Sequence, residues 1–403
     1  MTHAAPVRRL LAAKALRGFA DGYVALLLPA WLIERGFTPL QVGVIATTTL
    51  AGSGLATLGV GWIAHRYHYR ALLLAATVLM AATGLGFAAV TGYAPLLLVA
   101  FVGTLNPSSG DVSVFLPLEH AFMSRVVSDR DRTAAFARYS IVGALAGAAG
   151  SLAAGLPALI ERWPGLDAHG ALQAMFVLYA LIAGAAGLVY RGLPRAPGGD
   201  AAQRPRAALG PSKSRVYTLA ALFSVDAFAG GLVVQSMLAL WLYQRHGLSL
   251  AAAGTIFFWT GLLSAASFLA AVPVARRIGL VNTMVFTHIP AGICLVLIPF
   301  AASLPVVMAL LLVRAALSQI DVPTRSSYVM AIVTPEERPA AASATSVPRS
   351  LAAAASPFLA GWMLGISPFG WPLVAAGALK IAYDLALLVT FRDVRPPEEM
   401  GSG

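Results

Sequence analysis

The sequence predicts an all-α membrane protein with twelve transmembrane helices in two six-helix halves. Three observations predict this fold class: the composition, the length and number of the apolar segments, and a repeat between the halves. The 403 residues are 58% hydrophobic and only 11% charged, with a mean hydropathy of +0.77. Soluble domains carry about 25% charged residues. A chain this long cannot build a water-soluble surface from so few charges, so we expect it to lie in a lipid bilayer.

The expected helices are the apolar runs between charged residues or Pro/Gly punctuation, because a spanning helix needs about 20 mostly apolar residues. These runs are residues 10–34, 40–64, 70–92, 95–124, 133–159, 169–190, 216–243, 249–275, 279–302, 304–331, 339–365 and 368–391. Residues 191–215 are rich in Pro, Gly and Arg and have no apolar period. We therefore expect one bundle at 1–190, a basic linker at 191–215 and a second bundle at 216–403.

The basic residues indicate the orientation. They gather before the first span, between spans 2 and 3, 4 and 5, and 8 and 9, and in the linker, whereas each opposite loop holds one arginine or none. Basic loops stay on the cytoplasmic side. Both termini are therefore expected to be cytoplasmic, in a plasma membrane that we take to be a bacterial inner membrane. The formal net charge of +11 has the same origin, and no nucleic-acid partner is expected because no binding motif accompanies it.

The two halves repeat one another. The stretch ERGFTPLQVG (34–43) is echoed by RHGLSLAAAG (245–254), at an offset of 211 residues. Further on, SDRDRTAAFA (128–137) matches TPEERPAAAS (334–343) at an offset of 206, and this offset places Glu119 opposite Arg325. Parallel six-helix repeats of this kind are related by a pseudo-two-fold axis along the membrane normal.

The turn after the second span carries a motif. Residues 61–73, GWIAHRYHYRALL, resemble the signature G-x-L-a-D-r-x-G-r-k-x-x-l of the major facilitator superfamily. Gly61, Arg66 and Arg70 keep the pattern, and His65 stands at the position of the signature's aspartate. The resemblance implies that fold, with spans 1, 4, 7 and 10 around a central cavity. It also implies a role in conformational gating for these four residues.

Each of the spans that the resemblance places around the cavity carries an acid. The candidates for substrate and proton coupling are Asp21, Asp111, Asp226, Asp321 and, further along span 4, Glu119. A charged side chain in mid-membrane costs roughly 2.5–3.5 kcal/mol on insertion scales, so it should face a partner or a wet cavity. A carboxyl group there can exchange protons in the physiological pH range. Asp111 is the first candidate, because the preceding NPSSG (106–110) should break the helix.

Four arginines are candidates for substrate binding or charge pairing, and they are Arg17, Arg138, Arg325 and Arg349. Spans 10 and 11 adjoin in the expected fold. We therefore predict a pair between Asp321 and Arg349 near the middle of the membrane.

Other polar residues in the spans have local explanations. Arg17 lies one turn before Asp21 on the same helix face, so these two could pair with each other. Lys380 and Asp384 have the same spacing in span 12, and a local ion pair is expected there. His288 in span 9 is expected to be a hydrogen-bonded packing residue rather than a ligand.

The leading functional prediction is a secondary active transporter that moves a small organic solute by alternating access, with proton-coupled efflux by antiport as the expected form. Its partners would be a small-molecule substrate, protons and membrane lipid, and a monomer is expected. A second hypothesis is an organic-anion transporter that binds a carboxylate or phosphate through the arginines. A third is a ferroportin-like metal carrier, motivated by Asp21, Asp226 and His120. A non-transporting membrane sensor or receptor is the hypothesis from a different class.

No enzyme is predicted. The chain has no P-loop, zinc-ligand helix or nucleophile elbow, which are the short motifs that mark ATP-driven or hydrolytic sites. No cofactor and no resident metal are expected.

Overall fold

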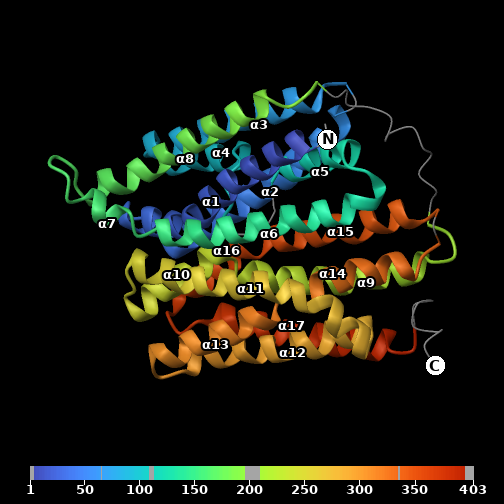
Figure 1. The fold of residues 1–403 in the computed structure, drawn as a ribbon. Helices are drawn as coiled ribbons and strands as arrows, with labels where there is room; N and C mark the ends of the chain where they lie inside the picture. The colour runs from blue at the N-terminus through green and yellow to red at the C-terminus, as the bar shows by residue number, and fades with distance from the viewer. Residues whose placement is uncertain (1–3, 65, 109–112, 196–208, 335, 395–403) are drawn as a thin grey trace. The chain divides into compact units, whose positions relative to one another are not determined.

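The computed structural model describes residues 4–64, 66–108, 113–195, 209–334 and 336–394. Every regular element within these ranges is a helix. The chain divides into two compact units, one formed by Met1–Gln203 with Val234–Phe258 and the other by Arg204–Val233 with Trp259–Gly403. In each unit, long helices run side by side (Figure 1). The predicted halves, which follow the sequence repeat, remain a prediction.

The first unit contains eight helices among its described residues before the linker, and one that follows it. They are α1 (Ala4–Glu34), α2 (Pro39–Ile63), α3 (Tyr69–Ala89), α4 (Tyr93–Val102), α5 (Phe115–Val126), α6 (Asp129–Ala153), α7 (Pro157–Ile160), α8 (Ala168–Arg191) and α10 (Gln235–His246). Helix α1 packs against α6, α8 and α10.

The second unit contains α9 (Lys213–Leu232), α12 (Leu280–Leu297), η1 (Ile298–Phe300), α13 (Leu304–Leu317), α14 (Asp321–Ala331), α15 (Arg338–Ala355), α16 (Pro357–Ile366) and α17 (Trp371–Phe391). Helix α11 (Leu250–Ile278) begins in the first unit and ends in the second. Helix α9 packs against α15 and α17, and α12 packs against α13, α14 and α17.

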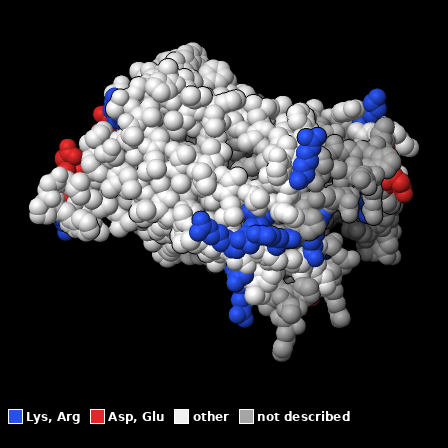
Figure 2. Space-filling view, turned by 90° about the horizontal axis from the view of Figure 1, so that it is seen from above, with Lys and Arg blue, Asp and Glu red and all other residues white. Residues whose placement is uncertain are grey.

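The helices have the length and surface of membrane spans. Ten helical stretches in the described part of the chain are long and apolar enough to cross a bilayer, and α4 is a shorter apolar helix. Many large apolar side chains are exposed, among them Val78, Leu181 and Val389, and most of the face in Figure 2 is uncharged. The protein is therefore an integral membrane protein. Predicted spans 4 and 11 are each built from two short helices, so the count of twelve stays a prediction.

Span 4 is interrupted where the NPSSG stretch predicts a break. Between α4 and α5, the Asn106 side chain accepts hydrogen bonds from the backbone N–H and the hydroxyl of Ser108, both at 3.0 Å. The Pro107 carbonyl accepts one from the Ser236 N–H at 3.1 Å. The Tyr179 hydroxyl donates to the Thr104 carbonyl at 3.2 Å. Backbone groups that leave a helix inside a membrane must find such partners, and here α8 and α10 provide them. Asp111 itself lies outside the described residues.

Three further predicted spans are divided. Span 7 changes from α9 to α10 at residues 233–234, span 10 changes from α13 to α14 at residues 318–320, and span 11 changes from α15 to α16 at Ser356. The break in span 10 comes directly before Asp321, the first residue of α14. Irregular backbone therefore adjoins an acid in span 10, as the sequence predicts for span 4.

Glycines allow α1 and α6 to approach closely. A Cβ on Gly22 would overlap the Gly147 carbonyl, and a Cβ on Gly18 would lie 2.9 Å from the Gly143 carbonyl oxygen. Small residues bring helix backbones together in this way inside membranes, where van der Waals packing drives association. The contact fixes α1, and with it Arg17, against α6.

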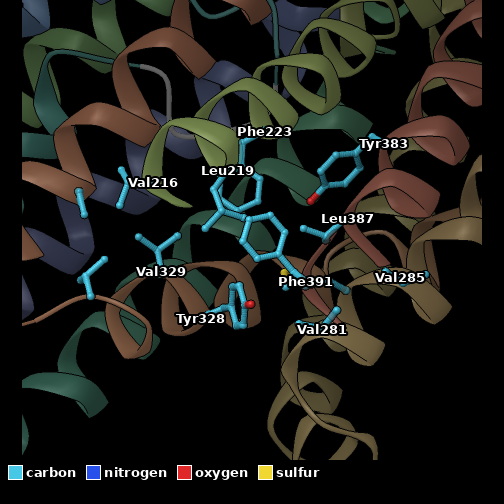
Figure 3. Packing of buried hydrophobic residues seen from close by; sticks show 13 residues of the cluster. Val216, Leu219, Phe223, Val281, Val285, Tyr328, Val329, Tyr383, Leu387 and Phe391 are labelled. Atoms are coloured by element: carbon cyan, nitrogen blue, oxygen red, sulfur yellow. The ribbon is translucent and has the colours of Figure 1, made fainter. Parts of the chain in front are cut away.

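A hydrophobic cluster forms the core of the second unit. Side chains from α9, α12, α14 and α17 meet in it, and Figure 3 shows the rings of Phe223, Tyr328, Tyr383 and Phe391 among them. Phe223 and Tyr383 contact edge to face, with 6.4 Å between their ring centroids. The same four helices carry the charged residues of the candidate site, so this core sets their spacing.

A carboxylate outside the spans joins two segments of the second unit. Glu337, directly before α15, accepts hydrogen bonds from the backbone N–H of Gly210 and of Ser212, the residue before α9. The Thr334 hydroxyl donates to its other oxygen at 3.3 Å. Hydrogen bonds from Ser212 and Gly210 lower the pKa of the Glu337 carboxyl below its usual value. Glu337 thus stays ionised and holds the start of α9 beside the start of α15.

The α1–α6 contact can be tested with Gly22→Ala. Alanine in place of glycine ordinarily stabilises a helix interior by about 1 kcal/mol, but here the added methyl must push α6 away. We expect a loss of about 1–3 kcal/mol, as for other overpacked cores, seen as a lower thermal unfolding midpoint of the purified protein.

Gly54→Ala in α2 is the matched control, because a Cβ there meets nothing within 4 Å. It should unfold at or above the wild-type temperature. A Gly22→Ala protein as stable as the Gly54→Ala protein would contradict the close approach.

Candidate functional site

Asp226 of α9 is the centre of a buried charge cluster in the second unit. Its Oδ2 accepts a hydrogen bond from Arg325 Nη1 at 2.8 Å, and its Oδ1 accepts one from Lys380 Nζ at 2.6 Å. Arg325 also pairs with Asp321, one turn earlier on α14, at 3.1 Å. All four residues are buried. Desolvating each charge costs several kcal/mol, so a buried acid of this kind is stable only when its oxygens are paired.

His288 of α12 extends the cluster to a third acid. Its Nδ1 lies 3.1 Å from both carboxylate oxygens of Asp384 on α17. Its Nε2 lies 3.4 Å from Lys380 Nζ and 3.8 Å from Asp226 Oδ1. An ionised Asp384 can only accept, so opposite it Nδ1 carries a proton, and a neutral ring then presents Nε2 as an acceptor to Lys380. His288 therefore connects Asp384 to the Lys380–Asp226 pair.

Two aromatic residues border this cluster. The Arg325 guanidinium lies 5.5 Å from the centre of the Phe223 ring, at cation–π distance. The buried Tyr383 hydroxyl has no hydrogen-bond partner among the described residues. Both rings belong to the hydrophobic cluster of Figure 3.

The first unit has its own buried charge cluster, around Arg17 of α1. Its guanidinium forms an ion pair with Glu119 of α5 and donates to the Tyr190 hydroxyl at 3.1 Å. The hydroxyls of Tyr139 and Tyr190 both donate to Glu119. The guanidinium also lies 4.1 Å from the centre of the Phe115 ring. Glu119 thus has three donors and is completely buried, so its charge is fully compensated.

The two clusters have opposite polarity at equivalent sequence positions. Span 1 contributes the arginine and span 4 the acid in one unit, whereas span 7 contributes the acid and span 10 the arginine in the other. The alignment at the 206-residue offset, which places Glu119 opposite Arg325, is consistent with this exchange. Phe115 and Phe223 place an aromatic ring beside the arginine in both cases.

Several predicted pairs are wrong. Asp321 pairs with Arg325, and Arg349 is exposed and makes no ion pair with Asp321. The reason is geometric: Arg325 follows Asp321 by one helical turn, which puts both side chains on the same face of α14.

The two expected local pairs are also absent. Arg17 pairs with Glu119, and Asp21 is only half-buried. Lys380 and Asp384 bind Asp226 and His288 respectively instead of each other. In both helices, the side chains bind partners on other helices instead.

The other predicted residues lie apart from the clusters. Arg138 of α6 is exposed. Among the gating candidates, Gly61 and Arg66 are exposed, while Arg70 Nη1 donates to the Leu193 carbonyl at 3.4 Å. His65 is outside the described residues. Their proposed role in gating remains a prediction.

Five members of the clusters are not among the predicted site residues, namely Tyr139, Tyr190, His288, Lys380 and Asp384; the last three are predicted to have local structural roles. The last three carried a usable signal, because an ionisable residue inside a span is a functional candidate by default. The tyrosines carried none, since a tyrosine in an apolar helix is unremarkable until its hydroxyl is seen to face a charge.

Comparisons with known proteins agree with this fold. A family model described as Major Facilitator Superfamily matches residues 10–317 and 219–402. The uncharacterized membrane protein YJR124C of Saccharomyces cerevisiae is 24% identical over 422 residues, covering 96% of this chain and 94% of the yeast protein.

Solved structures of transporters are similar in fold. A variant of the nucleoside transporter NupG matches with a TM-score of 0.79 and 13% identity, over 96% of this chain and 99% of the other. A bacterial homolog of the human lysosomal transporter Spinster, inward-facing and occupied, matches with a TM-score of 0.74 and 14% identity, over 96% of this chain and 97% of the homolog. The human organic anion transporter MFSD10 matches with a TM-score of 0.66 and 20% identity, over 96% of this chain and 100% of MFSD10.

The central position of Asp226 can be tested by comparing Asp226→Asn with Asp321→Asn. The first substitution leaves Lys380 without a carboxylate partner and leaves Arg325 with Asp321 alone. The second leaves Arg325 still paired with Asp226 and does not touch the partner of Lys380. Removing one partner of a buried pair typically costs about 3–5 kcal/mol. We expect Asp226→Asn to show a loss of that order in thermal unfolding, and Asp321→Asn a clearly smaller one. Equal losses, or the reverse order, would argue against the cluster as described.

Proposed function

The chain belongs to the Major Facilitator Superfamily, whose members are membrane transporters and not enzymes, and from this premise we propose that it moves a small organic solute by proton-coupled alternating access. The observation that carries the proposal is His288 held between Asp384, Lys380 and Asp226. Histidine is the side chain whose unperturbed proton exchange falls between about pH 5 and 8. A histidine bonded to both signs of charge inside a membrane is suited to carry the coupled proton.

The charges of the cluster support a proton at this place. Three acids, Asp226, Asp321 and Asp384, share two hydrogen-bonded bases, Arg325 and Lys380. One added proton would bring the net charge of these five groups to zero, and His288 lies between Asp384, Lys380 and Asp226. Arg349 is close enough to interact with the set electrostatically, but it is exposed and outside the hydrogen bonds.

A proton on His288 would change which groups bind Asp226. In the neutral ring, Nε2 accepts from Lys380, which in turn donates to Asp226 Oδ1. A protonated Nε2 becomes a donor, repels Lys380 and competes with it for the same oxygen, 3.8 Å away. Protonation would therefore loosen the link between α17 and α9 and favour one between α12 and α9. A two-state contact of this kind is what coupling between a proton and a conformation requires.

An organic anion is the second candidate for the substrate class. Arg138 and Arg349 are exposed and have no hydrogen bond or ion pair with any described residue. An unpaired arginine in an apolar span costs roughly 2.5–3.5 kcal/mol on insertion scales, so it should face water rather than lipid. Arginines in a water-filled path are suited to a carboxylate or phosphate. The likeness to MFSD10 shows the fold alone and does not decide between a neutral and an anionic solute.

A metal carrier and a membrane sensor have less support. A metal carrier would need Asp226 to be free for a cation, but three bases surround it. No group of three or more potential metal ligands occurs among the described residues. A sensor would not need a titratable link among four helices.

Proton coupling can be tested by flux into proteoliposomes, with a panel of nucleosides, organic anions and drug-like cations, with and without an imposed pH gradient. We expect one class to accumulate only with the gradient, and its direction tests the predicted antiport. His288→Gln should reduce that accumulation at least about tenfold, because glutamine cannot carry the proton.

His169→Gln is the matched control, since His169 is exposed and belongs to neither buried cluster. Its Nδ1 lies 3.6 Å from Glu34 Oε1. It should transport at the wild-type rate. Asp111→Asn tests the rival site predicted from the sequence. Gradient-driven transport that survives His288→Gln but is lost in Asp111→Asn would move the coupling role to Asp111.

We also propose that the protein is a monomer in a plasma membrane, that of bacteria in the first instance, with both termini in the cytoplasm. The distribution of basic residues supports this orientation. Single cysteines at residue 215 and at residue 162, in a variant with Cys294 replaced, can be labelled with a membrane-impermeant thiol reagent in intact cells. Only the cysteine at 162 should react. Labelling at 215 instead would reverse the orientation.

A further inference from the structure

A basic groove lies in the second unit, away from the buried cluster. It has a volume of about 670 Å³ and is lined by the end of α11, the start of α12, one side of α14 and the residues after α17. Three arginines line it: Arg276 and Arg277 from the last turn of α11, and Arg392 directly after α17. The sharp turn at Gly279, with φ of 82°, brings α12 back beside the two α11 arginines.

The positive charge of the groove is largely uncompensated. Arg276 and Arg277 are exposed and make no hydrogen bond or ion pair with the part of the chain that the structure describes. Arg392 has one acid at 3.5 Å, its exposed neighbour Asp393. Guanidinium groups bind phosphate oxygens in a bidentate manner. Three of them around one cavity, with two largely free, are suited to a phosphate group.

The other walls of the groove favour a lipid over a free ion. Thr324 and Ser327 of α14 add hydroxyls on one side. On the other side lie Val272 and Ile278 of α11, with 55% and 41% of their surface exposed. The apolar side chains continue along α11 to Leu269, which is 66% exposed. A polar end that leads onto exposed apolar surface matches a headgroup followed by an acyl chain.

We propose that this groove binds the phosphate of an anionic phospholipid headgroup, with the acyl chains lying along α11. The inference does not depend on proton coupling or on the identity of the solute. Its functional consequence follows from α14, because Thr324 lines the groove and also donates to the Asp321 carbonyl at 2.8 Å. A bound lipid therefore contacts the helix that carries Asp321 and Arg325, and it would stabilise the position of that helix.

Native mass spectrometry of the full chain, released from neutral detergent and titrated with phosphatidylglycerol, tests the proposal. The double variant Arg276→Gln/Arg277→Gln should weaken phosphatidylglycerol binding at least about tenfold, because it removes two of the three guanidinium groups. Phosphatidylcholine binding, with no net headgroup charge, should change little. The matched control is Arg162→Gln/Arg245→Gln, which removes the same charge from two exposed arginines outside the groove.

Three outcomes would overturn the proposal. Equal weakening in the control variant would mean that lipid responds only to total charge. Unchanged binding in the groove variant would place the lipid elsewhere. Displacement of phosphatidylglycerol by millimolar inorganic phosphate would show that the groove takes a free anion and has no preference for a lipid. Thermal unfolding of each variant within a few degrees of wild type shows that the comparison is made on folded protein.

Discussion

The pairing of Asp226 with Arg325 and Lys380 is the interaction on which the second unit depends. In an apolar environment an unpaired carboxylate is too costly to keep, so α9, α14 and α17 must present their charges to one another. The bases come from sequence positions 99 and 154 residues away. The hydrophobic cluster of Phe223, Tyr328 and Tyr383 packs these helices at the distance that the ion pairs require. Packing and charge therefore specify the same arrangement.

The two buried clusters differ in how many hydrogen-bond donors reach their acids. In the first unit Glu119 has Arg17 and two tyrosine hydroxyls, so its charge is met by donors and no proton is needed. In the second unit Asp384 has only the ring of His288 among its described hydrogen bonds, and that ring also faces Lys380 and Asp226. The first arrangement suits a rigid support and the second suits a switch. This difference is why we place the coupling proton in the second unit.

The sequence predicts the class of the protein and most of its helices, because lipid solvation acts on local composition and on segment length. It also predicts the break at NPSSG, since proline and its neighbours act on their own turn of helix. It identifies Asp226, Asp321, Glu119, Arg17 and Arg325 as costly residues that need partners. These predictions all rest on residues close together in the chain.

The choice of partner could not be predicted in the same way. Lys380 and Asp384 have the spacing of a local pair, and only the rotation of α17 against α9 and α12 decides that they bind Asp226 and His288 instead. The predicted ion pair between Asp321 and Arg349 is wrong for the same reason. It assumed that adjoining helices turn these two side chains toward each other. Helix rotation depends on packing across the whole unit, which no short stretch of sequence contains.

If His288 carries the coupled proton, it must gain and lose that proton during transport. The most direct measurement is ¹⁵N NMR of histidine-labelled protein in lipid, with the His288 signals assigned by their loss in His288→Gln and followed from about pH 5 to about pH 8, the range in which histidine ordinarily titrates. We predict a neutral ring protonated at Nδ1 at the upper end and a doubly protonated ring at the lower end. A His288 ring that keeps one protonation state over the whole range would contradict the claim.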